Sequence, residues 1–153
     1  MLTVDDALRL VLEHTEPLPP QPVELTGALG QVLAEPIVSD IDSPPHDKSI
    51  VDGYAVIADS LAGRDAELTV LEEVTAGACP TQTVKLGTTT RIMTGAPLPS
   101  GADAVVMVEQ TRLTASGKVQ ILQSPVRSSQ NIMRRAAAMA RGQIVLERGK
   151  SLR

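Results

Sequence analysis

The chain has almost no aromatic side chains: its 153 residues include no Trp, no Phe and a single Tyr, Tyr54. Single-stranded nucleic acids and sugars are usually held on aromatic rings, so the sequence argues against a base-stacking platform or a sugar-binding face. The core must instead be built from Leu, Val, Ile, Ala and Met, through many small contacts.

Cysteine and excess charge are also scarce. Cys79 is the sole cysteine, which excludes an intramolecular disulfide and a thiolate metal site. The net charge of −4 argues against a broad nucleic-acid-binding face. No apolar run approaches membrane-spanning length, and the N-terminus does not resemble a signal peptide. We therefore expect a cytoplasmic protein that binds neither nucleic acid nor membrane.

What the chain does contain is eleven Pro and eleven Gly residues, a composition typical of short strands joined by tight turns. Thr3 and the apolar spacing after it predict a first helix, and the prolines between positions 17 and 22 predict an extended linker. A strand-like Val23–Leu25 and a short helix from Thr26 through Leu33 follow. Further extended segments are predicted at residues 36–41, 54–57, 68–74, 88–93, 104–109, 111–113, 119–122 and 143–149.

Residues 44–56, with the sequence PPHDKSIVDGYAV, hold most of the candidate chemistry. Pro44-Pro45 keeps the preceding backbone extended, and the segment ends in an apolar strand. A loop held at both ends can present Asp47 and Asp52 rigidly. The alternative is that Asp52 and Gly53 form a tight turn, because both residue types tolerate a positive φ.

This segment resembles the PPFDNSAMDGYAV signature of the molybdopterin molybdenumtransferase (MoeA/gephyrin E-domain) family. RIMTGAPLP at 91–99, followed by GADAVVM at 101–107, is similar to that family's other N-terminal signature. The two motifs come in the expected order, and the resemblance covers the N-terminal region of the family, domains I and II, only.

One segment departs from the family pattern, which usually has Gly-Glu-Asn-Ile-Arg followed by Gly-Glu-Asp-Ile. This chain has SQNIMRR at 129–135 and then AAAM at 136–139, so the acidic residues are missing. The Ala-rich stretch 133–140 favours a helix on propensity.

The resemblance implies a mainly β fold with a few helices. In this fold a small β-barrel-like domain, residues 45–126, is inserted into an elongated α+β domain made of residues 23–44 and 127–153. Residues 1–22 form the N-terminal helix and Pro-rich linker. In the family this helix packs on a domain encoded further downstream, so we expect it here to be poorly anchored or to pack on a neighbouring copy.

The resemblance also implies an activity: insertion of molybdate into adenylylated molybdopterin, which releases AMP and yields molybdenum cofactor. The family acts as a homodimer with a divalent metal, usually Mg²⁺, bound mainly by a domain beyond Arg153. Asp52 and Thr94 match its functional Asp and Thr, and Ser49, Gly95 and Ala96 are expected substrate contacts. Residues 94–96 can offer a hydroxyl and closely spaced N–H groups to an oxyanion. No metal ligand is assigned, and without a pterin-sized pocket we expect this chain to be inactive alone.

Two other functions stay open. The first is a non-catalytic module that keeps the same fold and docks other proteins. The second is an independent metal hydrolase built on His46, Asp47 and Asp52, which would need more ligands than this loop offers.

Overall fold

A computed structural model describes residues 2–61 and 66–153 of the chain. The chain divides into two compact units: unit 2 is the continuous stretch Val38–Val145, and unit 1 combines Met1–Ile37 with Leu146–Arg153. The structure is mainly β with a few helices, which confirms the predicted fold class. The three-part division at residues 22, 44 and 126 stays a prediction.

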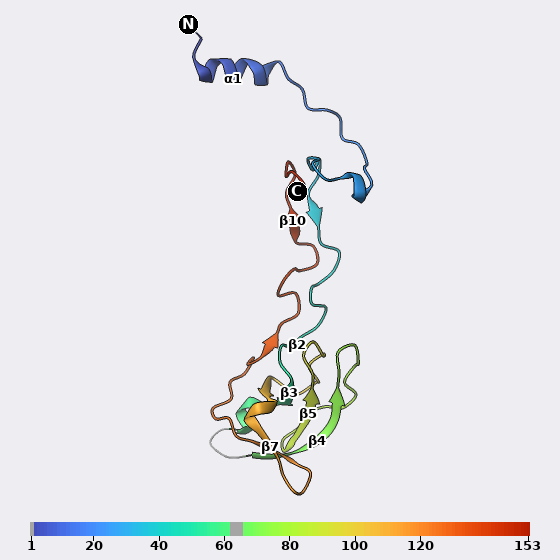
Figure 1. Ribbon diagram of the computed structural model, residues 1–153, viewed down its shortest axis with the longest axis vertical. Helices are drawn as coiled ribbons and strands as arrows, with labels where there is room; N and C mark the ends of the chain where they lie inside the picture. The colour runs from blue at the N-terminus through green and yellow to red at the C-terminus, as the bar shows by residue number, and fades with distance from the viewer. Residues whose placement is uncertain (1, 62–65) are drawn as a thin grey trace. The chain divides into compact units, whose positions relative to one another are not determined.

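Unit 2 is built on a six-stranded sheet with the strand order β6-β3-β5-β4-β8-β7. The β4–β5 pair is parallel and the other neighbouring pairs are antiparallel. The sheet curls into a half-barrel (Figure 1), in agreement with the predicted β-barrel-like domain. Its strands are β3 (Gly53–Val56), β4 (Ala66–Val74), β5 (Thr88–Ile92), β6 (Ala104–Met107), β7 (Thr111–Leu113) and β8 (Val119–Ile121).

Apolar side chains cover both faces of this sheet. Tyr54 and Val106 belong to one buried cluster, whereas their neighbours Ala55 and Val105 belong to another. Because successive side chains of a strand point to opposite faces, the two clusters lie on opposite sides of the sheet. Strands β3 and β6 are therefore buried on both faces at their centres. Such strands hold the loops at their ends firmly. The segment predicted to be extended at 104–109 is a strand only as far as Met107.

Shorter elements complete the structure. Within unit 2, β2 (Lys48–Ser49) pairs with β9 (Ile132–Met133), and two 3₁₀ turns, η2 (Ala58–Leu61) and η3 (Val108–Gln110), follow β3 and β6. Strand β1 (Ile37–Val38) pairs with β10 (Ile144–Leu146).

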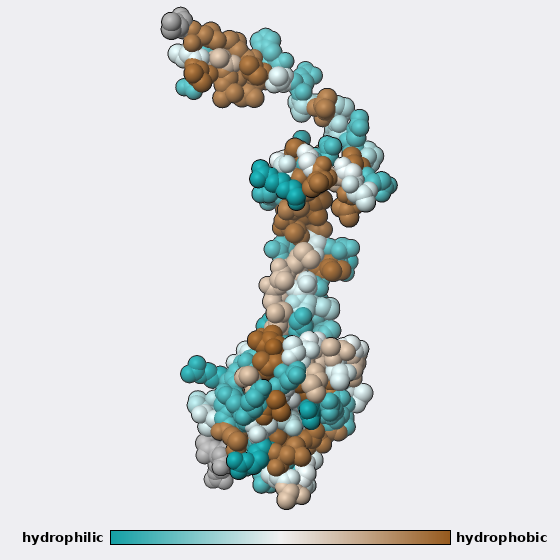
Figure 2. All heavy atoms as spheres, in the orientation of Figure 1, coloured by the Kyte–Doolittle hydropathy of each residue, from teal (hydrophilic) through white to brown (hydrophobic). Residues whose placement is uncertain are grey.

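Unit 1 contains the predicted first helix, α1 (Val4–Glu13), and the 3₁₀ turn η1 (Leu25–Gly27). The Thr3 hydroxyl caps α1 by accepting a hydrogen bond from the Asp6 N–H at 3.2 Å. No described residue of unit 1 is buried, and Figure 2 shows α1 with much of its surface in apolar side chains. No helix in the described part of the chain is long and apolar enough to cross a membrane.

The helix predicted from Thr26 through Leu33 is wrong, because the structure has only the single turn η1 there. Gly30 adopts a φ of 81°, and the N–H groups of Gly30 and Leu33 donate to the Leu152 and Lys150 carbonyls at 2.9 Å. Hydrogen bonds to the C-terminal segment thus use backbone N–H groups that a helix would need for its own hydrogen bonds. Val23–Leu25 is not a strand either.

The helix favoured at 133–140 is also absent. The N–H of Ala136 donates to the Pro44 carbonyl at 3.0 Å, and that of Ala138 donates to the Ser43 carbonyl at 2.9 Å. These long-range partners, together with a φ of 60° at Ala136, override the helical propensity of alanine.

Gly53 does not form the tight turn that its Asp-Gly sequence suggested as an alternative. It begins β3 and is not among the glycines with a positive φ. A Cβ atom at this position would lie 2.0 Å from the Val106 carbonyl oxygen of β6. Glycine is required here because β6 approaches so closely.

Candidate functional site

Asp52 and Thr94 come together at one end of the half-barrel, where β3 begins and β5 ends. Asp52 directly precedes β3, Thr94 follows the end of β5, and these two strands are antiparallel neighbours in the sheet. The backbone N–H and the hydroxyl of Thr94 both donate to Asp52 Oδ1, each at 2.7 Å. Both residues are exposed, so the pair is a fixed feature of the surface.

This geometry makes the two carboxylate oxygens of Asp52 different. Oδ1 accepts both bonds from Thr94, whereas Oδ2 accepts none from the described residues. The hydrogen bond from the Thr94 hydroxyl, then that from its N–H, lowers the pKa of Asp52, and the positive charge of Arg91 lowers it further. Asp52 is therefore ionised at neutral pH and offers Oδ2 as an acceptor.

Ser49, Gly95 and Ala96 join the loops that carry the two family motifs. The Ser49 N–H donates to the Ala96 carbonyl at 3.0 Å, and the Gly95 N–H donates to the Ser49 carbonyl at 2.9 Å. Ser49 is 1% exposed, and its hydroxyl donates to the Val51 carbonyl. These contacts hold Asp52 and Thr94 at a fixed separation, and the assignment of the three residues to substrate binding stays a prediction.

The expectation that residues 94–96 offer N–H groups to an oxyanion is wrong. The N–H of Thr94 donates to Asp52, that of Gly95 to Ser49, and that of Ala96 to the Met93 carbonyl at 3.0 Å. The Thr94 hydroxyl proton is also directed at Asp52. Because these donors are committed inside the loop, the Asp52–Thr94 pair presents acceptor atoms, which suit a ligand that donates hydrogen bonds.

Asp47 serves as an anchor for the segment that follows β9. Its carboxylate accepts a bond from the Arg135 N–H at 2.8 Å and another from the Arg134 guanidinium. The Arg135 N–H, then Arg134, holds the pKa of Asp47 below its ordinary value. Asp42 acts in the same way, because it accepts bonds from the Arg141 N–H at 2.8 Å and from the Arg135 side chain.

The proposed hydrolase site does not form around these residues. Asp47 faces the two arginines, and His46 is exposed. Among residues 2–61 and 66–153 no three His, Cys, Asp or Glu side chains gather in an arrangement that could hold a metal ion.

Ion pairs within unit 2 also escaped the sequence reasoning. Arg91, in the quoted motif, has its Nε 3.9 Å from Glu73 Oε2 on the neighbouring strand β4. The pairing of β4 with β5 is parallel and follows a long connection, so no local pattern indicates it. Asp42 and Arg135 are 93 positions apart, and only the fold brings them together.

Comparisons with known proteins place the chain in a family. Residues 2–153 match the family model described as MoeA N-terminal region (domain I and II). A molybdopterin molybdenumtransferase of Haemophilus influenzae is 37% identical over 154 residues, which cover 99% of this chain and 37% of that protein. The protein of the same name from Staphylococcus epidermidis is 32% identical over 152 residues, covering 97% and 36%.

A solved structure is similar over the same region. The crystal structure of a molybdopterin biosynthesis moeA protein from Pyrococcus horikoshii matches with a TM-score of 0.87 and 37% identity, covering 97% of this chain and 40% of that one. The chain thus spans well under half the length of these relatives. Its sequence, its half-barrel sheet and its two signature loops show that the chain belongs to the MoeA N-terminal region (domain I and II) family.

Proposed function

We propose that this chain is the part of a molybdopterin molybdenumtransferase that supplies Asp52 and Thr94 to a reaction centre completed by other polypeptide. The reaction inserts molybdate into adenylylated molybdopterin and releases AMP. The observation that supports this proposal is the outward Asp52 carboxylate, held by two 2.7 Å bonds from Thr94. A carboxylate with one committed and one free oxygen is suited to meet a ligand in a single orientation.

In this proposal Asp52 acts through Oδ2, which accepts a hydrogen bond or a proton from a donor on the substrate. Thr94 keeps the carboxylate in place and ionised, so that its effect on the reaction is exerted through Asp52. Ser49, Gly95 and Ala96 set the spacing of the two loops. Any contact of these three residues with substrate is made on the surface that the two loops form together.

The divalent metal of the family, Mg²⁺, does not fit this chain's residues as a complete site. Mg²⁺ takes oxygen ligands in near-octahedral geometry, and Asp47 and Asp42 are already bound to arginine side chains and backbone amides. We therefore place the Mg²⁺ site on other polypeptide and assign no metal ligand here. Mg²⁺ would there neutralise phosphate and molybdate charge.

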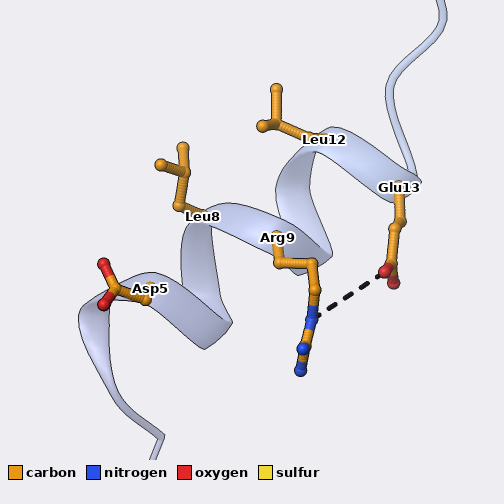
Figure 3. Close-up of a pocket in the computed structure, with 5 residues that line it drawn as sticks. All are labelled: Asp5, Leu8, Arg9, Leu12 and Glu13. Carbon is orange, nitrogen blue, oxygen red and sulfur yellow. Dashed lines mark ion pairs between the residues drawn. The ribbon is translucent and has the colours of Figure 1, made fainter.

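We further propose that the assembled enzyme is a homodimer in the cytoplasm. The apolar side chains that α1 exposes support its association with other polypeptide. Leu8 and Leu12 of α1 are 57% and 65% exposed and project from the same side of the helix, away from the Arg9–Glu13 ion pair (Figure 3). An apolar stripe of this kind is stable when it is covered by another surface. We propose that the cover is the remainder of the enzyme or its second subunit, and that this chain is inactive alone.

The test joins this chain to the remainder of a molybdopterin molybdenumtransferase and measures AMP release. Asp52→Ala is expected to reduce turnover strongly, while Asp40→Ala, at an exposed position outside residues 44–56, leaves it unchanged. If AMP release is unaffected by Asp52→Ala, the catalytic role is lost and the alternative, a non-catalytic docking module, is favoured.

A further inference from the structure

A third loop lies at the end of the half-barrel that carries Asp52 and Thr94. Strands β4 and β5 are parallel, so the loops that follow them leave the sheet at the same end (Figure 1). A Cβ atom added to Gly95 would lie 3.8 Å from the Cβ of Ala76, the second residue after β4. Ala76 is exposed, so it is part of the surface beside the loop whose Thr94 binds Asp52.

Residues 75–79 form an exposed turn that is not anchored by any buried side chain of its own. The Ala78 N–H donates to the Thr75 carbonyl at 3.0 Å, and Gly77 between them has a φ of 86°. This bond shapes the turn but does not fix its position relative to the sheet. The position therefore depends on how the chain is held on either side of the turn.

The Glu72 carboxylate holds the chain just after the turn. Its oxygens accept hydrogen bonds from the N–H groups of Thr81 and Gln82, at 3.0 and 2.9 Å, and from the Thr81 hydroxyl at 2.7 Å. The Gln82 side chain in turn donates to the Leu71 carbonyl at 3.1 Å. The chain thus leaves β4 and returns to it within ten residues, with the turn closed between the two points.

A β-bulge gives Glu72 this direction. In the pairing of β4 with β5, Val70 is opposite Thr89 and Glu73 is opposite Arg91, so the register shifts between them and Glu72 lies in the bulge. Bulges are frequent next to active sites, where they change the direction of a side chain. Here the bulge and the hydrogen bonds of Glu72 occur on the strand whose following loop borders the candidate site.

We propose that Glu72 is a positioning residue for the substrate-binding surface: it keeps Ala76 against Gly95, so that Ala76 borders the place where substrate meets the Asp52 carboxylate. The inference rests on the proposed role of Asp52. Glu72 does not itself contact the substrate, because both of its oxygens already accept hydrogen bonds from the loop. Its effect on the reaction is exerted through the position of Ala76.

The first test follows the backbone amide signals of Ala76 and Gly95 in this chain by NMR. Glu72→Ala removes the hydrogen bonds to the loop and is expected to shift both signals and to increase the motion of the Ala76 amide. Glu72→Gln keeps the shape and one acceptor oxygen, so its shifts should be smaller than those of Glu72→Ala. Glu67→Ala removes the same charge from an exposed position on β4 and is expected to leave both signals unchanged.

The second test measures kcat, and KM for adenylylated molybdopterin, in the joined enzyme. Glu72→Ala is expected to raise KM about tenfold with little change in kcat, because the loop contributes to binding rather than to the chemical step. Ala76→Leu adds bulk at the border itself and should also raise KM. Ala115→Leu, in the exposed turn between β7 and β8, should leave KM unchanged. A merely structural role of Glu72 would lower the amount of folded enzyme and leave KM unchanged.

The proposal is overturned if Glu72→Ala moves the Ala76 and Gly95 signals no more than Glu67→Ala does, or if Glu72→Ala leaves KM at the wild-type value. These outcomes can be told apart from failure of the proposed function. If Asp52→Ala abolishes AMP release while Glu72→Ala leaves KM unchanged, the role of Asp52 stands and only the role of Glu72 is lost.

Discussion

Single atoms decide how the candidate site works. Thr94 directs both its N–H and its hydroxyl at one oxygen of Asp52, at 2.7 Å each. A carboxylate held in this way loses rotational freedom, and its charged form is favoured over the protonated form. The residue identities of the motif could be predicted from the sequence, but the direction of these donors could not, because it depends on how β3 and β5 are aligned.

The hydroxyl of Thr94 can be removed while its shape and backbone are kept. Thr94→Val is expected to raise the pKa of Asp52, because the hydrogen bond with the largest effect on it is lost. Thr94→Ser keeps the hydroxyl and should leave the pKa nearly unchanged. NMR titration of the Asp52 carboxyl checks this, and an equal pKa in the Val and Ser variants would show that the hydroxyl has no influence.

Ala136 has a φ of 60°, a conformation that glycine adopts freely and alanine does not. The family pattern has Gly at this position. Ala136→Gly is expected to raise the free energy of unfolding by about 1 kcal/mol, the relieved strain minus the added flexibility of the unfolded chain. Urea denaturation measures it.

Ala137→Gly is the matched control, because Ala137 is not among the residues with a positive φ. It should lower the free energy of unfolding by up to about 1 kcal/mol. A loss of stability in both variants would mean that Ala136 is not strained.

At the level of strands and helices, the sequence predicted what is periodic and missed what is paired over long distances. The alternation of β4, the hairpin of β7 and β8 and the apolar β6 all follow from local patterns, as does α1 behind its Thr3 cap. The helix expected at 133–140 failed because Ala136 and Ala138 bind carbonyls of Pro44 and Ser43. Propensity describes an isolated segment and cannot include such partners.

The pairing of β3 with β6 depends on the absence of a side chain at Gly53. Gly53→Ala is expected to lower the free energy of unfolding by about 3 kcal/mol or more, because the new Cβ would lie 2.0 Å from the Val106 carbonyl oxygen and the strands must separate. Chemical denaturation and the hydrogen exchange of the Val106 amide report on this change.

Gly27→Ala is a suitable comparison, since the nearest atom to its added Cβ is a Val23 side-chain carbon at 3.4 Å. It is expected to change stability by less than about 0.5 kcal/mol. If Gly53→Ala changed the free energy of unfolding as little as Gly27→Ala does, β6 would not approach β3 so closely.

For the whole molecule, four carboxylates make the free energy of unfolding depend on pH. Hydrogen bonds lower the pKa values of Asp42, Asp47, Asp52 and Glu72 below their ordinary 3.8 for Asp and 4.5 for Glu. The unfolded chain therefore binds protons more readily than the folded one in acid. The stabilisation is fully present above these ordinary values and is lost as the pH falls through the lower folded values.

Urea denaturation at pH 7, 5, 4 and 3 is expected to give a nearly constant free energy of unfolding down to about pH 5 and a decline below it. Asp47→Asn should show a smaller decline than the wild type, because one of the four groups no longer titrates. A free energy that rises as the pH falls from 5 to 3 would contradict the assigned hydrogen bonds.

Function at this scale depends on what the chain presents to other polypeptide. The family and the mainly β fold could be predicted from the resemblance of two sequence motifs. These motifs include the loops that β3 and β5 fix in place. The hydrogen bonds made by the N–H groups of residues 94–96 could not be predicted, since their partners include Ser49, which is far away in the sequence. The site is consequently an acceptor site, and its donors must come from the ligand.

The most direct test of the central claim is the turnover of the joined enzyme with Asp52→Asn, compared with Asp40→Asn. Asparagine keeps the size of the side chain but removes its charge, so AMP release should fall about 100-fold or more if Asp52 acts in the reaction. Asp40→Asn should match the wild type. Equal AMP release from the Asp52→Asn and wild-type enzymes would contradict the account.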